Sequence, residues 1–167
     1  MKPVIAFTIG DVNGIGPEVV LKTIADKELM GSFYPVLIGP EFIWQSTAKE
    51  LKIDLKFKPY STNLGNEINS AFIFDLEYPE KINFGKITSN SGLLSIKSIF
   101  TAYSLCKFKH AQGIVTAPIS KEAINLAGFH YDGHTGLLSE ISNNKKVCMV
   151  LMSDTMKVGL VTTHIPI

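Results

Sequence analysis

Cysteine is scarce in this sequence, since Cys106 and Cys148 are the only two among 167 residues. Both stand in apolar stretches without a partner at metal-ligand spacing. We therefore expect two buried, reduced thiols rather than a disulfide framework or a zinc site. No apolar run approaches the roughly 20 residues that a membrane-spanning helix needs. The N-terminus also lacks the long apolar core and small-residue cleavage site of a secretory signal, so the cytoplasm is the expected compartment.

A strong charge of one sign is also missing, because 16 Lys and Arg face 15 Asp and Glu, for a formal net charge of +1. Nucleic acids and anionic membranes both select clustered basic residues, so the composition supports neither as a partner. Hydrophobic residues make up 46% and charged residues 19%, which is typical of a globular chain rather than a disordered one. The length suits one domain, or one domain with part of another.

Strand-like and helix-like segments alternate along the chain, which predicts an α/β fold with a mainly parallel sheet. The expected strands are 4–9, 34–38, 55–57, 72–74, 113–116, 147–152 and 157–163. The expected helices are 17–29, 41–51, 91–108, 121–126 and 133–142. The helix at 91–108 is too apolar for a surface helix, so we expect it to pack deeply or against a second chain. The short turn at 153–155 permits the last two strands to form an antiparallel hairpin.

Two segments have the composition of anion-binding loops. Gly10–Glu18, with the sequence GDVNGIGPE, follows a strand and opens a helix, so its amides could face an anion. Its glycine spacing matches neither the dinucleotide fingerprint nor the P-loop. A tight turn that needs glycine for backbone reasons alone explains it equally well. Thr116–Lys121 stands where a parallel strand ends, which is where α/β sheets bind ligands. Lys121 there either holds a phosphate or carboxylate, or is an ordinary solvated lysine.

Histidines supply the remaining candidates. His134 stands at an expected helix N-terminus, where it can donate to an oxyanion, and Thr135 adds a hydroxyl that both donates and accepts. His164 stands at a strand exit and is well placed to ligate a metal. One histidine does not define a metal site, because catalytic metals usually have at least three protein ligands. His110 and His130 lack local partners and are expected to be exposed.

Taken in order, four segments resemble one family, 4-hydroxythreonine-4-phosphate dehydrogenase. GDVNGIGPE resembles its early G-x-x-x-G-I-G-P-E turn, and TAPISKEAINLAG resembles its T-G-P-[IV]-x-K-x-x-[IL]-N-x-A-G segment. DGHT resembles its G-H-T motif, and VTTHIPI its T-T-H-[IL]-P-[IL] motif. Each motif alone is weakly specific, whereas all of them in one order are highly specific. The resemblance runs from Lys2 to the last residue.

The resemblance implies a fold like that of isocitrate and isopropylmalate dehydrogenases: three αβα layers with a mainly parallel sheet, plus part of a second lobe. It also implies a homodimer with a shared active site. The implied activity is oxidation, with NAD or NADP, and decarboxylation of 4-phosphohydroxy-L-threonine to 3-amino-2-oxopropyl phosphate in pyridoxal phosphate biosynthesis. One alternative is a sister dehydrogenase for another phosphorylated hydroxy acid, such as a four-carbon sugar acid phosphate. Another is a catalytically inactive half-chain.

Residue roles carry over from the resemblance one by one. His134 and Thr135 match the substrate-binding pair of the family. His164 matches the first of the histidines that bind a divalent metal such as Zn, Mg or Co. Lys121 matches a lysine of the active-site cleft, and we expect it to be catalytic.

Family members are considerably longer than this chain. We therefore expect residues 1–167 to be the N-terminal portion of a two-lobe dehydrogenase, without the C-terminal portion that carries the other metal ligands and most of the NAD site. The isolated chain is then expected to be inactive. Two positions depart from the family pattern: Gly136 stands where Glu is usual, and Ala117 stands where Gly is usual.

Overall fold

The computed structural model describes residues 2–64, 70–79, 81–131, 133–143 and 147–161. The chain divides into two compact units, Met1–His130 and Tyr131–Ile167. Among the described residues, no helix combines the length and apolar character needed to cross a membrane.

The first unit is built on a five-stranded sheet in the order β3-β4-β2-β1-β5. Every neighbouring pair of strands in it is parallel, which confirms the predicted α/β class. The strands are β1 (Val4–Thr8), β2 (Tyr34–Ile38), β3 (Lys56–Pro59), β4 (Ser70–Phe74) and β5 (Gly113–Val115). The helices between and after them are α1 (Gly16–Ile24), α2 (Lys27–Met30), α3 (Glu41–Glu50), α4 (Ser89–Lys107) and α5 (Lys121–Leu126).

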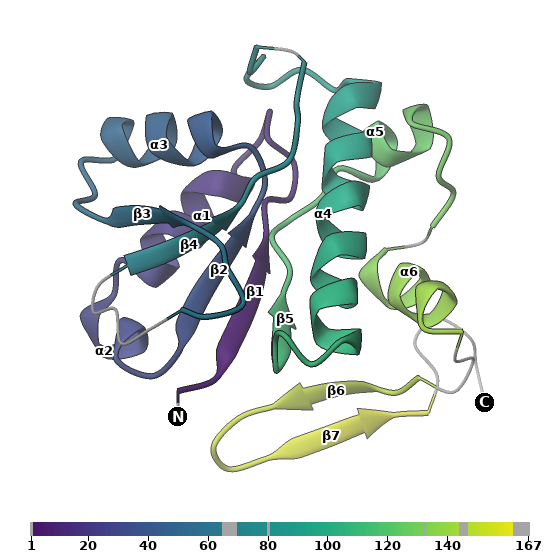
Figure 1. The fold of residues 1–167 in the computed structure, drawn as a ribbon. Helices are drawn as coiled ribbons and strands as arrows, with labels where there is room; N and C mark the ends of the chain where they lie inside the picture. Colours follow the sequence, from purple (N-terminus) through teal and green to yellow (C-terminus); the bar gives the residue numbers. More distant parts are fainter. Residues whose placement is uncertain (1, 65–69, 80, 132, 144–146, 162–167) are drawn as a thin grey trace. The chain divides into compact units, whose positions relative to one another are not determined.

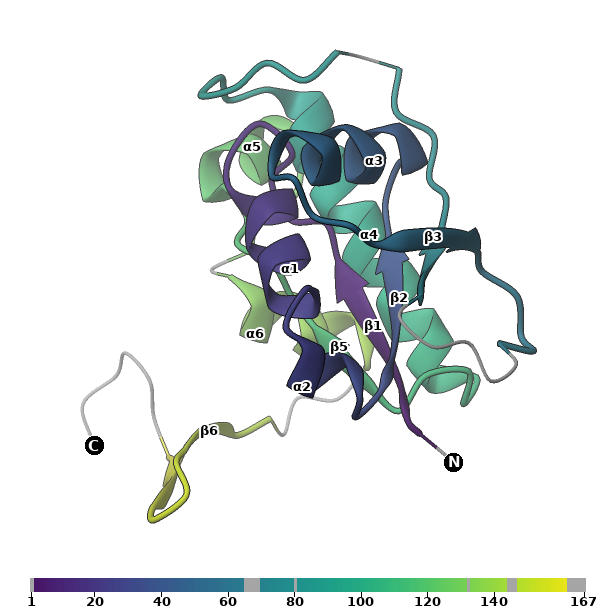
Figure 2. The ribbon, with the colours of Figure 1, turned by 90° about the vertical axis from the view of Figure 1, so that its left-hand side faces the viewer.

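The sheet buries both of its faces, so successive strand residues enter two different cores. Helices α1 and α3 lie over one face and α4 lies over the other (Figures 1 and 2). The first core includes Phe7, Leu37, Leu21 and Trp44, and the second includes Ala6, Ile38, Ala102 and Leu105. These layers are the three-layer αβα arrangement that the family resemblance implied.

The long helix α4 packs deeply, as its apolar composition predicts. Leu94, Ile96 and Ile99 are almost completely buried, whereas Phe100 is 38% exposed. The helix begins after Thr88, whose side chain accepts a hydrogen bond from the Ser91 amide and so caps the first turn.

The single helix predicted for residues 17–29 is wrong. Helix α1 ends at Ile24, and a separate helix α2 begins at Lys27. Between them the Asp26 carboxylate accepts hydrogen bonds from the Glu28 and Leu29 amides. Aspartate stabilises a helix more as its N-cap than at an interior position. The apolar residues of this segment keep a helical spacing across the break, so the spacing alone predicts one continuous helix.

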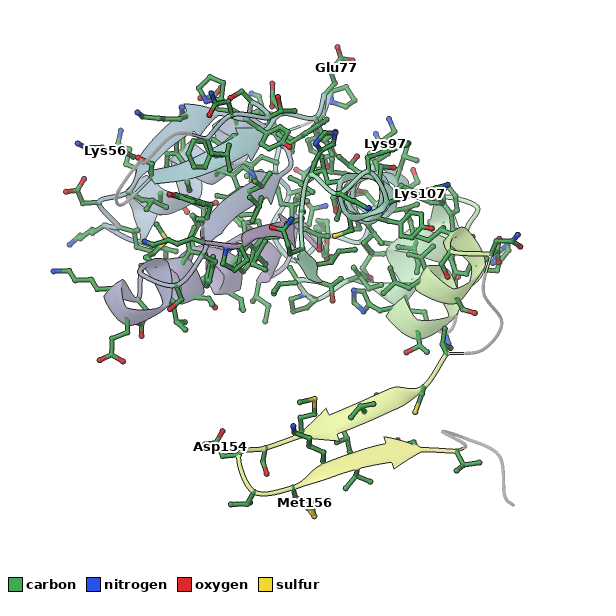
Figure 3. All side chains as sticks on the ribbon, turned by 60° about the horizontal axis from the view of Figure 1, so that its bottom comes forward. Lys56, Glu77, Lys97, Lys107, Asp154 and Met156 are labelled. Carbon is green, nitrogen blue, oxygen red and sulfur yellow. The ribbon has the colours of Figure 1, made fainter. Side chains whose placement is uncertain are left out.

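The second unit holds α6 (His134–Ile141) and a hairpin of β6 (Met149–Met152) and β7 (Lys157–Leu160). The hairpin is antiparallel and pairs Leu151 with Val158, which confirms the predicted arrangement. Figure 3 labels Asp154 and Met156 at its turn.

The expectation of two buried thiols is wrong for Cys148, which is exposed beside the hairpin, and is met only in part by Cys106. A two-stranded hairpin has no opposing layer of its own to cover such a side chain. Both cysteines are free, as predicted, and partial burial raises the pKa of the Cys106 thiol.

Candidate functional site

The order in which strands are added to the sheet reverses at β1, which has β2 on one side and β5 on the other (Figure 1). The strands β2, β3 and β4 all lie on one side of β1. After α4 the chain adds β5 on the other side. Ligands of open α/β sheets bind at the carboxyl ends of the strands on either side of such a switch point. The two loops that leave this edge are the glycine turn after β1 and the segment Thr116–Lys121 after β5.

These two loops contact each other directly. The Asp11 amide donates to the Pro118 carbonyl oxygen at 2.8 Å, and the Ala117 amide donates to the Thr8 hydroxyl at 3.1 Å. Gly10 has a φ of +68°, and a side chain there would collide with the Pro118 carbonyl oxygen. Glycine is therefore required at position 10 for two reasons, its backbone conformation and the close approach of the second loop.

Asn13 connects the glycine turn to the segment before α4. It is a polar residue in a buried position, with only 2% of its surface exposed. Its side-chain amide donates to the Lys86 carbonyl at 2.9 Å and to the Thr88 hydroxyl at 3.3 Å. Its side-chain oxygen accepts from the Asn83 amide at 2.9 Å. Each polar atom of this side chain is thus hydrogen-bonded, which gives the buried asparagine a structural task.

Lys121 is the first residue of α5 and is exposed. The preceding residue, Ser120, caps that helix by accepting a hydrogen bond from the Ala123 amide, as the sequence predicts. Lys121 is therefore held at the carboxyl edge of the sheet, three residues after Pro118, which accepts the hydrogen bond from the glycine turn.

His134 and Thr135 open helix α6 in the second unit, after Gly133 with a φ of +142°. His134 is half-buried and Thr135 is exposed. Within this unit the Tyr131 hydroxyl donates to the Glu140 carboxylate at 3.1 Å. Since Lys121 belongs to the other unit, its convergence with His134 and Thr135 in one cleft stays a prediction.

The predicted metal ligand His164 lies outside the described residues. Among the residues that the structure describes, no three His, Cys, Asp or Glu side chains are grouped as metal ligands. His110 and His130 are exposed, as expected. The described part of the chain therefore provides no metal site by itself.

A hollow of about 530 Å³ lies at the carboxyl ends of β2 and β4, to one side of the switch point. Its lining includes Glu77 and Lys97, which Figure 3 labels, together with Asp75. The Asp75 carboxylate is engaged, because it accepts a hydrogen bond from the Glu41 amide at 2.8 Å at the start of α3. None of the residues predicted from the sequence lines this hollow.

Sequence reasoning missed Thr8 and Asn13 as organisers of the switch point. A threonine at the end of a buried strand and an asparagine inside a glycine turn are both suited to hydrogen-bond nearby backbone. Which backbone groups they bind depends on segments at least 70 positions away in the sequence.

Residues 32–167 match the family model described as pyridoxal phosphate biosynthetic protein PdxA. The chain belongs to this family. Its fold is that of the PdxA structures, which is isocitrate dehydrogenase-like, as the resemblance implied.

Two enzyme names occur among the curated relatives compared with this chain. The chain is 35% identical over 176 residues to the D-threonate 4-phosphate dehydrogenase of Pectobacterium atrosepticum, covering 99% of this chain and 52% of that protein. It is 33% identical over 168 residues to the 4-hydroxythreonine-4-phosphate dehydrogenase of Trichlorobacter lovleyi, covering 98% of this chain and 50% of that protein.

Solved structures of PdxA relatives agree with the fold. The crystal structure of a 4-hydroxythreonine-4-phosphate dehydrogenase from Burkholderia phymatum matches with a TM-score of 0.91 at 29% identity, over 99% of this chain and 51% of that one. The enzyme of that name from Klebsiella pneumoniae matches with a TM-score of 0.89, again at 29% identity, over 99% of this chain and 51% of that one. The chain thus spans about half the length of the relatives it matches.

Replacing Gly10 by alanine tests the close contact between the glycine turn and the loop after β5. Gly85 provides a matched control, because its φ of +72° is similar but its position opens on free space. Gly85→Ala should cost about 1–2 kcal/mol for the left-handed backbone alone. Gly10→Ala should cost a further ~1–3 kcal/mol for the collision with Pro118. Denaturant unfolding of both variants measures the difference, and equal losses of stability would show that the loops do not press on each other.

Proposed function

We propose that this chain is part of a dehydrogenase that uses NAD or NADP to oxidise and decarboxylate 4-phosphohydroxy-L-threonine, in pyridoxal phosphate biosynthesis. The observation that carries the proposal is the pair of family motifs that meet at the switch point, where the Asp11 amide binds the Pro118 carbonyl. Relatives over the same span are named dehydrogenases of small phosphorylated hydroxy acids, which supports the reaction class.

D-threonate 4-phosphate is the second candidate substrate, because several of the matched relatives are named for it. The two acids share a carboxylate, a secondary alcohol on the carbon β to that carboxylate, and a terminal phosphate. They differ only in carrying an amino group or a hydroxyl next to the carboxylate. One active site can therefore run the same reaction on either acid, and preference depends on the groups that face that single substituent.

The proposed reaction removes a hydride from the carbon that bears the secondary alcohol and passes it to the nicotinamide. A base takes the hydroxyl proton, and the alcohol becomes a ketone. The resulting β-keto acid then loses its carboxylate as carbon dioxide, and the carbon left behind takes up a proton. His134 and Thr135 are proposed to orient the substrate by hydrogen bonds, and Lys121 to bind or transfer a proton in the cleft.

We propose that the enzyme also uses a divalent metal, because the family that the sequence resembles does so. When bound, such an ion would make the substrate alcohol more acidic and stabilise the negative charge that develops on decarboxylation. His164 is the proposed ligand from this chain. The described residues contain no complete ligand set, so the remaining ligands are proposed to come from outside them. The two free thiols agree with a reducing compartment, and we propose the cytoplasm.

The substrate assignment is tested by assaying the 167-residue chain beside any longer product of the same reading frame. Each is mixed with NAD, a divalent ion and either candidate acid. We expect reduction of NAD by the longer product with phosphohydroxythreonine, and none by the 167-residue chain. Turnover of D-threonate 4-phosphate alone would favour the second candidate. Robust turnover by the 167-residue chain would contradict its proposed inactivity.

The metal assignment is tested by His164→Ala in the protein that turns over substrate. Losing one imidazole should weaken metal binding, measured by calorimetry, and reduce kcat at least about 100-fold. His110→Ala removes an exposed histidine instead and should change neither quantity. Unchanged metal affinity in His164→Ala would show that this imidazole is not a ligand.

We also propose that the chain forms a homodimer through one face of the β6–β7 hairpin. The strand register places Met149, Leu151, Val158 and Leu160 on one face of the pair. That face is wholly apolar, and Leu151 is 56% exposed. The opposite face carries the charged Lys157 and Gly159 together with Val150 and Met152, so it is less uniformly apolar. A two-stranded hairpin is marginal alone, and a second copy of the same apolar face would cover it symmetrically.

Two lysine substitutions on β6 test this interface. Leu151→Lys puts a charge on the apolar face and should convert dimer to monomer, since a buried unpaired charge is costly. Met152→Lys makes the same charge change on the opposite face, where Met152 is already 67% exposed, and should leave the dimer intact. Light scattering after size exclusion measures the mass of each. Equal masses for the two variants would argue against this face.

A further inference from the structure

Helix α4 supports both loops of the switch point from one side. Its first turns pack against α5, the helix that begins at Lys121 (Figure 1). Gly92 makes that packing possible, because any side chain there would collide with the Ala123 carbonyl. The same region of α4 carries Ser95, which is 1% exposed.

The Ser95 hydroxyl reaches out of its helix to the glycine turn. It lies 2.7 Å from the Gly10 carbonyl oxygen and 2.9 Å from the Ser91 carbonyl of its own helix. The Gly10 carbonyl and the Asp11 amide are the two ends of one peptide group. That amide donates to the Pro118 carbonyl at 2.8 Å. A continuous series of hydrogen bonds therefore runs from α4 through one peptide group to the loop after β5.

This series restrains the peptide group that follows Gly10. Gly10 has no side chain to limit its backbone, so the peptide group after it can rotate unless both ends are bound. Hydrogen bonds in series also polarise one another, so the bond to Gly10 strengthens the bond to Pro118. Gly10 is buried, so leaving its carbonyl without a hydrogen bond would destabilise the folded state.

We propose that Ser95 is a positioning residue of the active site, holding the Gly10–Asp11 peptide so that the loop leading to Lys121 stays in place. The proposal rests on the function proposed above. Ser95 itself contacts no reacting group in this role, and its effect on catalysis passes through Lys121. A displacement of about 1 Å in a group that binds or transfers a proton can cost up to ~100-fold in rate.

Ser98 provides a matched control on the same helix. It is as buried as Ser95, and its hydroxyl donates to the Ser95 carbonyl at 2.8 Å. The hydrogen bonds described for it therefore stay within α4. Ser95→Ala and Ser98→Ala remove the same atom from neighbouring turns, and only the first removes a bond to the glycine turn.

Amide hydrogen exchange of the 167-residue chain, followed residue by residue by NMR, tests the structural part without any assay of activity. Ser95→Ala should speed exchange of the Asp11 amide about 3- to 10-fold, the factor that one hydrogen bond of ordinary net strength is worth. Ser98→Ala should leave the Asp11 amide unchanged. Equal exchange at Asp11 in the two variants overturns the proposal.

A double-mutant cycle in the protein that turns over substrate tests the catalytic part. Ser95→Ala should lower kcat about 10-fold or more in the wild-type background and have little further effect in Lys121→Ala, because the two residues then act in series. Multiplicative effects would overturn a role through Lys121. If the wild-type protein oxidises neither acid, the proposed function fails instead, and the exchange result alone decides whether Ser95 holds the loops.

Discussion

The hydrogen bond from the Asp11 amide to the Pro118 carbonyl joins two segments more than 100 positions apart in the sequence. Everything proposed for the first unit depends on it, because it fixes the loop after β1 against the loop after β5. Only glycine at position 10 permits the two segments to come so close. The polar side chains around it, Thr8 and Asn13, are buried and bonded to backbone groups. Such a junction is rigid, which suits loops that must present groups to a ligand.

The second unit leaves much of its apolar surface uncovered. Its hairpin carries large apolar side chains that remain exposed, including Leu151 and Val158, which pair across the strands. Burying such side chains is the main source of stability for a sheet, so this hairpin is not a finished structural layer. The first unit, by contrast, encloses two cores, one on each face of its sheet. The two units therefore differ in how much of their apolar surface they cover themselves.

Local sequence patterns predicted most elements of the fold correctly. The strand at 34–38 has the predicted bounds, and the cap at Ser120 and the hairpin were also predicted. These features depend on neighbouring residues, which is why the sequence reveals them. The break at Asp26 and the exposure of Cys148 were missed. The first depends on a competition between two helical arrangements of one segment, and the second on the absence of a covering layer in the hairpin.

The amino-acid sequence by itself determined the α/β class, the family and the candidate residues Lys121, His134, Thr135 and His164. Motif order and periodicity are properties of the linear chain, so no coordinates were needed for them. Only the tertiary structure decided that the two loops meet at the switch point, that Ser95 binds the backbone of the glycine turn, and that Asn13 binds the backbone of the segment before α4. Those contacts depend on strand order and helix packing, which bring distant backbone groups within hydrogen-bonding distance and leave no trace in the local sequence.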